Sequence, residues 1–141
     1  MIWLTLAALA AVAVARHRLV VVTVMGTSMV PTHHPGDRVL VLRTGHVRQG
    51  QVVVAKSPPS DEPGLVIKRI AATPGDEVPP SVRGVVAATV VPAGRLVLIG
   101  DAHSSVDSRV WGLVASENVV GVVVARLHQN PHGGSVAPWH T

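Results

Sequence analysis

The sequence of 141 residues contains no cysteine, no phenylalanine and no tyrosine, and only 2% of its residues are aromatic. The absence of cysteine excludes disulfide bonds, thiolate metal sites and a cysteine nucleophile, so a nucleophilic side chain here has to be Ser or Thr. Without Phe and Tyr the core has to be aliphatic, and the abundant valine favours β-strands.

Charge is also scarce, because Asp, Glu, Lys and Arg together make up 14% of the chain and the formal net charge is +4. The basic residues are scattered and are not interleaved with aromatic ones, so nucleic acid is not a predicted partner. A small positive charge fits solubility or attraction to an anionic membrane surface.

Short valine-rich runs separated by Gly and Pro fill most of the chain, whose length fits one domain with a core of its own. The predicted strands are 19–25, 37–43, 50–56, 64–71, 94–100 and 118–127. Because the strands do not alternate with helices, we expect a mostly β protein built on an antiparallel sheet.

The N-terminal residues 2–15 are apolar apart from Thr5, and Arg16 and Arg18 end this run. We predict a short membrane anchor helix over 1–18, although 14 residues reach only about 21 Å of the roughly 30 Å of a bilayer core. Two alternatives are a cleaved signal peptide, favoured by the Ala-Val-Ala at 13–15, and a buried helix of a soluble domain.

A serine lies in an unusual setting in the run GTSMVPT, directly after an apolar strand. A serine needs a base to become a nucleophile at neutral pH, and histidine is the usual partner. The chain has eight histidines, but they lie in loops, in the tail or beside the apolar helix. No histidine constellation points to a catalytic triad, and neither His33 nor His34 has partners at metal-ligand spacing. We therefore expect no metal and no cofactor.

Lysine offers a more specific candidate, because the chain contains only Lys56 and Lys68. Strand alternation would put Val66, Lys68 and Ile70 on one face. If that face is the core, burial lowers the pKa of the amine and makes it a general base. If the alternation runs the other way, Lys68 reaches solvent. Spacing alone leaves both readings open.

Three segments together resemble the type I signal peptidases, the Ser-Lys membrane proteases grouped as S26. GTSMVPTHHPGD (26–37) resembles their nucleophile box, VIKRIAATPGD (66–76) their lysine box, and GDAHSSVDSRVWGLV (100–114) their third box. The segments occur in the order of the family. Any one of them is a modest signal, whereas the ordered set is a strong one.

The resemblance implies a mostly β, coiled antiparallel signal-peptidase-like fold with one N-terminal hydrophobic helix. It assigns Ser28 as nucleophile, Lys68 as general base and Ser105 as the residue that orients the lysine amine. It also implies two supporting ion pairs, Arg69 with Asp101 and Asp107 with Arg109. Gly26 would permit a positive φ beside the nucleophile, whose own backbone N–H would face the oxyanion.

The substrates implied by the resemblance are precursor proteins whose signal or leader peptides carry small residues at the first and third positions before the cut. We expect Met29, Val30 and the strand before Ser28 to form the pocket wall. Residues 19–128 would be the catalytic domain and 129–141 a flexible tail. Membrane lipid is the other predicted partner.

Membrane topology is where the sequence and the resemblance conflict. Arg16 and Arg18 follow the apolar helix and no basic residue precedes it, so the positive-inside rule puts the catalytic domain in the cytoplasm. The resemblance puts the domain outside, and we favour that side. Two alternative functions follow: a dedicated maturation protease with a single client on the cytoplasmic side, favoured by the compact chain, or a degenerate homologue that binds signal sequences without cleaving them.

Overall fold

The computed structural model describes residues 1–129, in which one antiparallel sheet carries most of the regular structure and an N-terminal helix much of the rest. The strands are β1 (Leu19–Thr23), β2 (Arg38–Leu42), β3 (Val52–Lys56), β4 (Leu65–Ala72), β5 (Arg95–Ile99), β6 (Val114–Ala115) and β7 (Val119–His128). The helical elements are α1 (Ile2–Arg18), α2 (Ser108–Trp111) and two single 3₁₀ turns, η1 (Pro80–Val82) and η2 (Ser116–Asn118). The predicted mostly β fold with one N-terminal helix is confirmed. The predicted tail lies outside the described residues except for Gln129.

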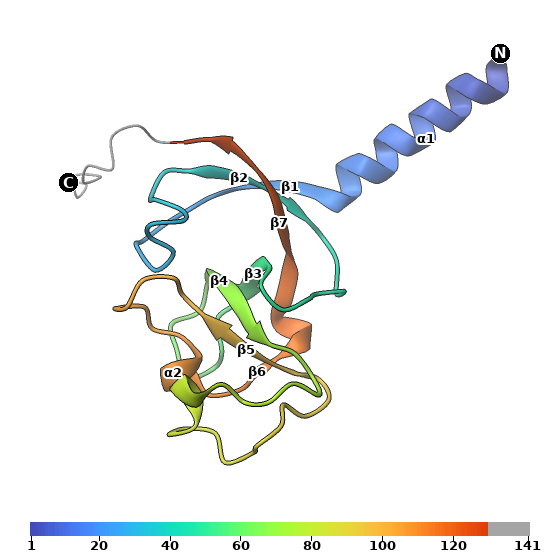
Figure 1. The fold of residues 1–141 in the computed structure, drawn as a ribbon. Helices are drawn as coiled ribbons and strands as arrows, with labels where there is room; N and C mark the ends of the chain where they lie inside the picture. Colours follow the sequence, from blue (N-terminus) through green and yellow to red (C-terminus); the bar gives the residue numbers. More distant parts are fainter. Residues whose placement is uncertain (130–141) are drawn as a thin grey trace.

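The strand order is β1-β2-β7-β3-β4-β5-β6, so β7, the last strand within residues 1–129, lies inside the sheet between β2 and β3 (Figure 1). β7 pairs with β2 through Arg38 to Leu42 and with β3 through Val53 to Ala55, and both pairings contain register shifts. Such irregularities bend the strand and increase its twist. β7 therefore joins the pair β1–β2 on one side to β3, β4, β5 and β6 on the other, and the sheet curls.

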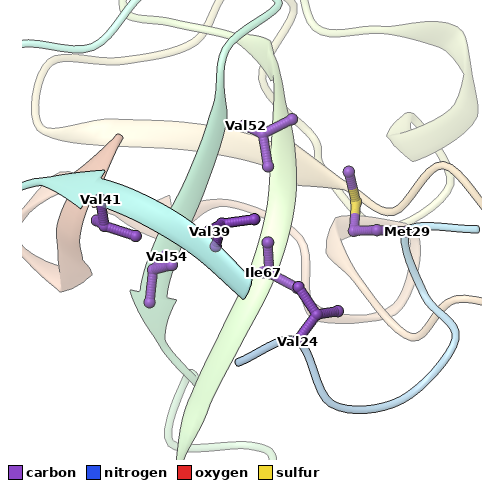
Figure 2. Packing of buried hydrophobic residues seen from close by; sticks show 7 residues of the cluster. All are labelled: Val24, Met29, Val39, Val41, Val52, Val54 and Ile67. Atoms are coloured by element: carbon purple, nitrogen blue, oxygen red, sulfur yellow. The ribbon is translucent and has the colours of Figure 1, made fainter. Parts of the chain in front are cut away.

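Valine and other aliphatic side chains fill the core on both faces of the central strands. Val52 and Val54 point into one cluster, whereas Val53 and Ala55 point into another. Figure 2 shows the first cluster, which consists of Val24, Met29, Val39, Val41, Val52, Val54 and Ile67. Each side chain buried in this way contributes about 1.5–3 kcal/mol. β4, the strand that carries Lys68, is packed in the same way, with Ile67 in the first cluster and Ile70 in the other, and this packing fixes the direction of its side chains.

Helix α1 extends away from the sheet and continues directly into β1 (Figure 1). It has 17 residues, none of which is buried, and Arg16, His17 and Arg18 form its last turn. Within residues 1–129, no helix combines the length and the apolar character needed to cross a bilayer. The prediction of a membrane-spanning anchor over 1–18 is therefore not supported.

Candidate active site

A pocket of about 330 Å³ lies between the end of β1 and the first half of β4. Residues 22–25 form one wall, residues 65–68 form the other, and Val54 contributes from β3. Ser28 and Lys68 both line this pocket, although 40 positions of the chain separate them. The predicted nucleophile and the predicted base therefore meet at one largely aliphatic cavity.

Lys68 is buried, with 4% of its surface exposed, and it lies opposite Val53 in the β3–β4 pair. Its Nζ donates a hydrogen bond to Ser105 Oγ at 2.8 Å. Burial lowers the pKa of Lys68 below its ordinary value of 10.5, and this effect outweighs the opposing attraction of Asp107. The neutral amine, which can accept a proton, is thus favoured relative to a lysine in water.

Ser28 is half-buried, and its backbone is positioned by the residues on both sides of it. Gly26 has φ +73°, a conformation that side chains other than glycine rarely adopt, as the sequence predicted. The Ser28 carbonyl accepts a hydrogen bond of 2.9 Å from the backbone N–H of Ala102. Its Oγ donates to the carbonyl of Ile67 at 3.5 Å, a long contact that leaves the hydroxyl weakly held. Ser28 Oγ therefore faces the backbone next to Lys68.

The segment from Gly100 to Trp111 brings Ser105 to the lysine, and buried Asp107 organises it. Asp107 accepts hydrogen bonds from the N–H of Gly100 at 2.8 Å and from the side chain of Arg109, with an ion-pair distance of 2.7 Å. Burial by itself raises the pKa of Asp107, but the hydrogen bonds from Arg109 and Gly100 hold that pKa below 3.8. Asp107 also caps α2 by accepting the N–H of Arg109. The ionised carboxylate therefore closes the loop around Ser105.

A second ion pair connects the lysine strand to both loops. Arg69 Nη2 lies 2.7 Å from Asp101 Oδ2, and the hydrogen bond from Arg69 holds the pKa of Asp101 below 3.8. Thr32 Oγ1 donates to the same carboxylate, so the loop after Ser28 is tied to β4. Thr32 was missed by sequence reasoning, although it is the last residue of the Ser-Met-x-Pro-Thr run.

Met29 and Val30, which follow Ser28 and were predicted to form the pocket wall, do not line the pocket. Met29 is 1% exposed and packs in the first cluster, as Figure 2 shows. The residues that line the pocket include neither Met29 nor Val30 but do include the end of the strand before Ser28. Consecutive side chains point in different directions, so a half-buried serine at the pocket leaves its large apolar neighbour to the core. Leu65, Val66 and Ile67, which the sequence analysis did not assign to the pocket, form the opposite wall.

His33 is a buried side chain near the site for which sequence reasoning found no role. It is 6% exposed, and its Nδ1 has no hydrogen-bond partner. Burial and the nearby cation of Arg126 lower the pKa of His33 below 6.5, although Asp37 opposes this change. Among residues 1–129, no three His, Cys, Asp or Glu side chains are grouped as metal ligands. His33 is therefore a neutral part of the loop that follows Ser28.

Acidification is expected to destabilise the fold through His33. Between the lowered folded pKa and 6.5, the unfolded chain binds a proton that the folded chain does not, so stability falls as the pH decreases through this range. Thermal melts of the protein at pH 7.5 and 5.5 measure the loss. The loss should be smaller in His33→Gln and unchanged in His46→Gln, which alters an exposed loop histidine. An equal loss in all three proteins would contradict the prediction.

The comparison with known families agrees with this geometry. A family model described as signal peptidase, peptidase S26, matches residues 1–85 and 79–128, which together cover most of the chain. No curated protein matches the chain. Members of the matched family are serine peptidases, typically membrane-associated, that act on precursor proteins with signal peptides. The chain belongs to the signal peptidase family, peptidase S26.

Proposed function

We propose that this protein is a serine endopeptidase that removes signal or leader peptides from precursor proteins, with Ser28 as nucleophile and Lys68 as general base. One observation carries the proposal: a lysine that is 4% exposed and bonded to Ser105 lines the same pocket as Ser28. A buried amine with a lowered pKa is a base of the kind that a serine hydroxyl needs.

The proposed reaction is acyl transfer in two steps. Neutral Lys68 takes the proton of Ser28 Oγ as that oxygen bonds to the scissile carbonyl carbon. The peptide C–N bond then breaks, and the lysine ammonium gives its proton to the leaving amine. In the second step Lys68 removes a proton from water as the water oxygen bonds to the acyl carbon. The ester bond to Ser28 then breaks, and the lysine ammonium returns its proton to Ser28 Oγ, which restores the hydroxyl and the neutral amine. Charge on the carbonyl oxygen would be stabilised by the N–H of Ser28, with Thr27 as a neighbouring hydroxyl.

The apolar lining of the pocket supports uncharged residues before the cut. Its walls are mainly aliphatic, with Val22, Val24 and Val54 facing Leu65 and Val66. Such walls have few polar groups to pair with a charged side chain, and an unpaired buried charge is costly. An Ala-x-Ala sequence would bury small methyl groups there without that cost.

The remaining predicted site residues would position the nucleophile and the base. Ser105 would orient the lysine amine through its 2.8 Å hydrogen bond, and Asp107 with Arg109 would hold the Ser105 loop. Arg69 and Asp101 would hold the loop after Ser28, through Thr32, against β4. These four charged residues would contribute geometry to the site and take no part in proton transfer.

We further propose that residues 19–128 form the catalytic domain and that the protein works at a membrane surface, on the extracytoplasmic side. Trp3, Leu4 and Leu9 of α1 are largely exposed, and the helix carries basic residues in its last turn. A helix with exposed apolar side chains and basic residues at one end favours association with a lipid surface. The extracytoplasmic side fits the substrate class, because exported precursors present their signal peptides there.

Cleavage of a fluorogenic Ala-x-Ala peptide by the full chain in detergent tests the proposal. The intact protein should cleave the peptide, and Ser28→Ala should remove activity down to the background. Ser81→Ala, which changes an exposed serine in η1, should retain full activity. Mass spectrometry of the products identifies the scissile bond.

The outcomes separate the proposed function from its alternatives. In one outcome the protein fails to cleave the Ala-x-Ala peptide and yet cleaves one precursor on inverted membrane vesicles, whose cytoplasmic face is outside. That result would favour the dedicated cytoplasmic maturation protease. Tight binding of signal peptides without cleavage of any of them would overturn the enzyme assignment and favour a non-enzymatic binder.

A further inference from the structure

We propose that Trp111 is a positioning residue for Lys68, whose indole ring stabilises the lysine ammonium while that ammonium carries the proton of Ser28. The inference rests on the proposed function, in which Lys68 is the base. Lys68 Nζ lies over the ring of Trp111, 5.7 Å from its centroid. This distance is within the roughly 6 Å over which an aromatic face attracts a cation.

The position of Trp111 is held by the same short segment that carries Ser105. Trp111 is the last residue of α2, and its N–H donates to the carbonyl of Asp107 at 2.9 Å. Buried Ser108 accepts the N–H of Leu98 at 2.9 Å, which attaches the helix to β5. The indole packs against the second hydrophobic cluster, which is the one that contains Val53 and Ala55 of β3 and Ile70 of β4. The ring is thus held at the lysine by contacts that do not involve the lysine itself.

The ammonium form of Lys68 needs such a partner more than the neutral form does. Proton transfer from Ser28 would create a positive charge on a side chain that is 4% exposed, where water offers little solvation. Ser105 Oγ accepts one hydrogen bond from Lys68 Nζ. Asp107 attracts the charge but is already paired with Arg109, which repels it, and Asp61 is the other carboxylate that acts on the amine. The face of an indole attracts a cation but not a neutral amine, so the ring favours the charged state selectively.

The absence of other nearby lysines makes the inference measurable. The chain contains only Lys56 and Lys68, so ¹³C-labelling of lysine gives two side-chain signals, and Lys56→Arg assigns them. In the intact protein the εCH₂ protons of Lys68 should be shifted upfield by the ring current of Trp111. A Lys68 signal without this upfield shift would overturn the inference, and this measurement needs no Trp111 variant.

Titration of the Lys68 signal in two variants tests the electrostatic role. Trp111→Leu keeps an apolar side chain but removes the aromatic face, so the Lys68 pKa should fall further, by about half to one pH unit. Trp111→Phe keeps a face and should restore much of this change. If Trp111 only excludes water, the Leu and intact proteins should titrate alike, and Trp111→Ala should raise the pKa by admitting water. That pattern would overturn the inference.

The titration separates failure of this inference from failure of the proposed function. The acidic limb of kcat/KM for peptide cleavage should move to lower pH in Trp111→Leu, in parallel with the Lys68 signal. A shifted signal in a protein that cleaves no peptide would retain the contact and reject the peptidase. The opposite result is a folded Trp111→Leu protein with full peptidase activity, an unchanged Lys68 pKa and an unchanged acidic limb of kcat/KM. It would reject the role of Trp111 and retain the peptidase.

Discussion

Replacing Lys68 with methionine is expected to lower peptide cleavage by about 10²–10⁴-fold while making the protein more stable. The rate falls because a positioned general base contributes a factor of this size. Stability rises because methionine has a similar shape and no amine to desolvate, at a site that is 4% exposed. Ser105 would keep a partner, because its hydroxyl also bonds to Asp107. Peptide kinetics and thermal melts measure the two effects.

The stability gain of Lys68→Met should depend on pH in a defined direction. The folded pKa of Lys68 is lowered, so between that pKa and 10.5 the unfolded chain binds a proton that the folded chain releases, and the resulting penalty disfavours folding at every pH below this range. The gain should therefore be present at neutral pH and shrink as the pH rises toward 10.5. Lys56→Met, at an exposed strand end, is the matched control and should retain activity. A destabilised Lys68→Met protein, or one that cleaves normally, would contradict the prediction.

Adding one methyl group at Gly100 is expected to damage both the fold and the site. A Cβ on Gly100 would lie 2.1 Å from Ser105 Oγ and 2.6 Å from the carbonyl oxygen of Ser28. The second of these atoms belongs to the backbone, which cannot rotate away as a side chain can. Gly100→Ala should therefore cost about 1–3 kcal/mol of stability, as overpacking does. It should also lower cleavage by about 10²-fold, because a displacement of about 1 Å is enough for such a loss.

The control for Gly100→Ala is Gly84→Ala, since a Cβ there would meet no atom within 4 Å. That variant should retain both its melting temperature and its activity. Urea unfolding and peptide kinetics on the two variants separate crowding at the site from the general effect of losing a glycine. Normal cleavage by Gly100→Ala would contradict the prediction, because it would show that activity does not depend on the close approach of Gly100 to Ser28.

The positions of the strands were largely predictable because they depend on local sequence. The run GLVIKRIA predicts a strand over 64–71, and the structure has β4 over Leu65–Ala72. Valine-rich runs bounded by Gly and Pro carry this information within a few neighbouring residues. β6 was not predicted because it contains only Val114 and Ala115, which is too short for a pattern.

The setting of Lys68 was only half predictable. Alternation indicated that Val66, Lys68 and Ile70 share a face, but a period of two does not say which face is covered. In the structure Ile70 belongs to the second cluster and Ile67 to the first, so both faces of β4 are packed. The resemblance to the signal peptidases, and not the spacing of residues, indicated that Lys68 is buried.

By itself the sequence determined the strands, the order of the three boxes and the candidate serine and lysine, because each of these features depends on a few neighbouring residues. Only the tertiary structure decided that β7 lies between β2 and β3, that Met29 turns into the core and that the ring of Trp111 lies at the Lys68 amine. Such contacts join residues that are tens of positions apart. They depend on how whole elements pack and bend against one another, and no local pattern in the sequence encodes that packing.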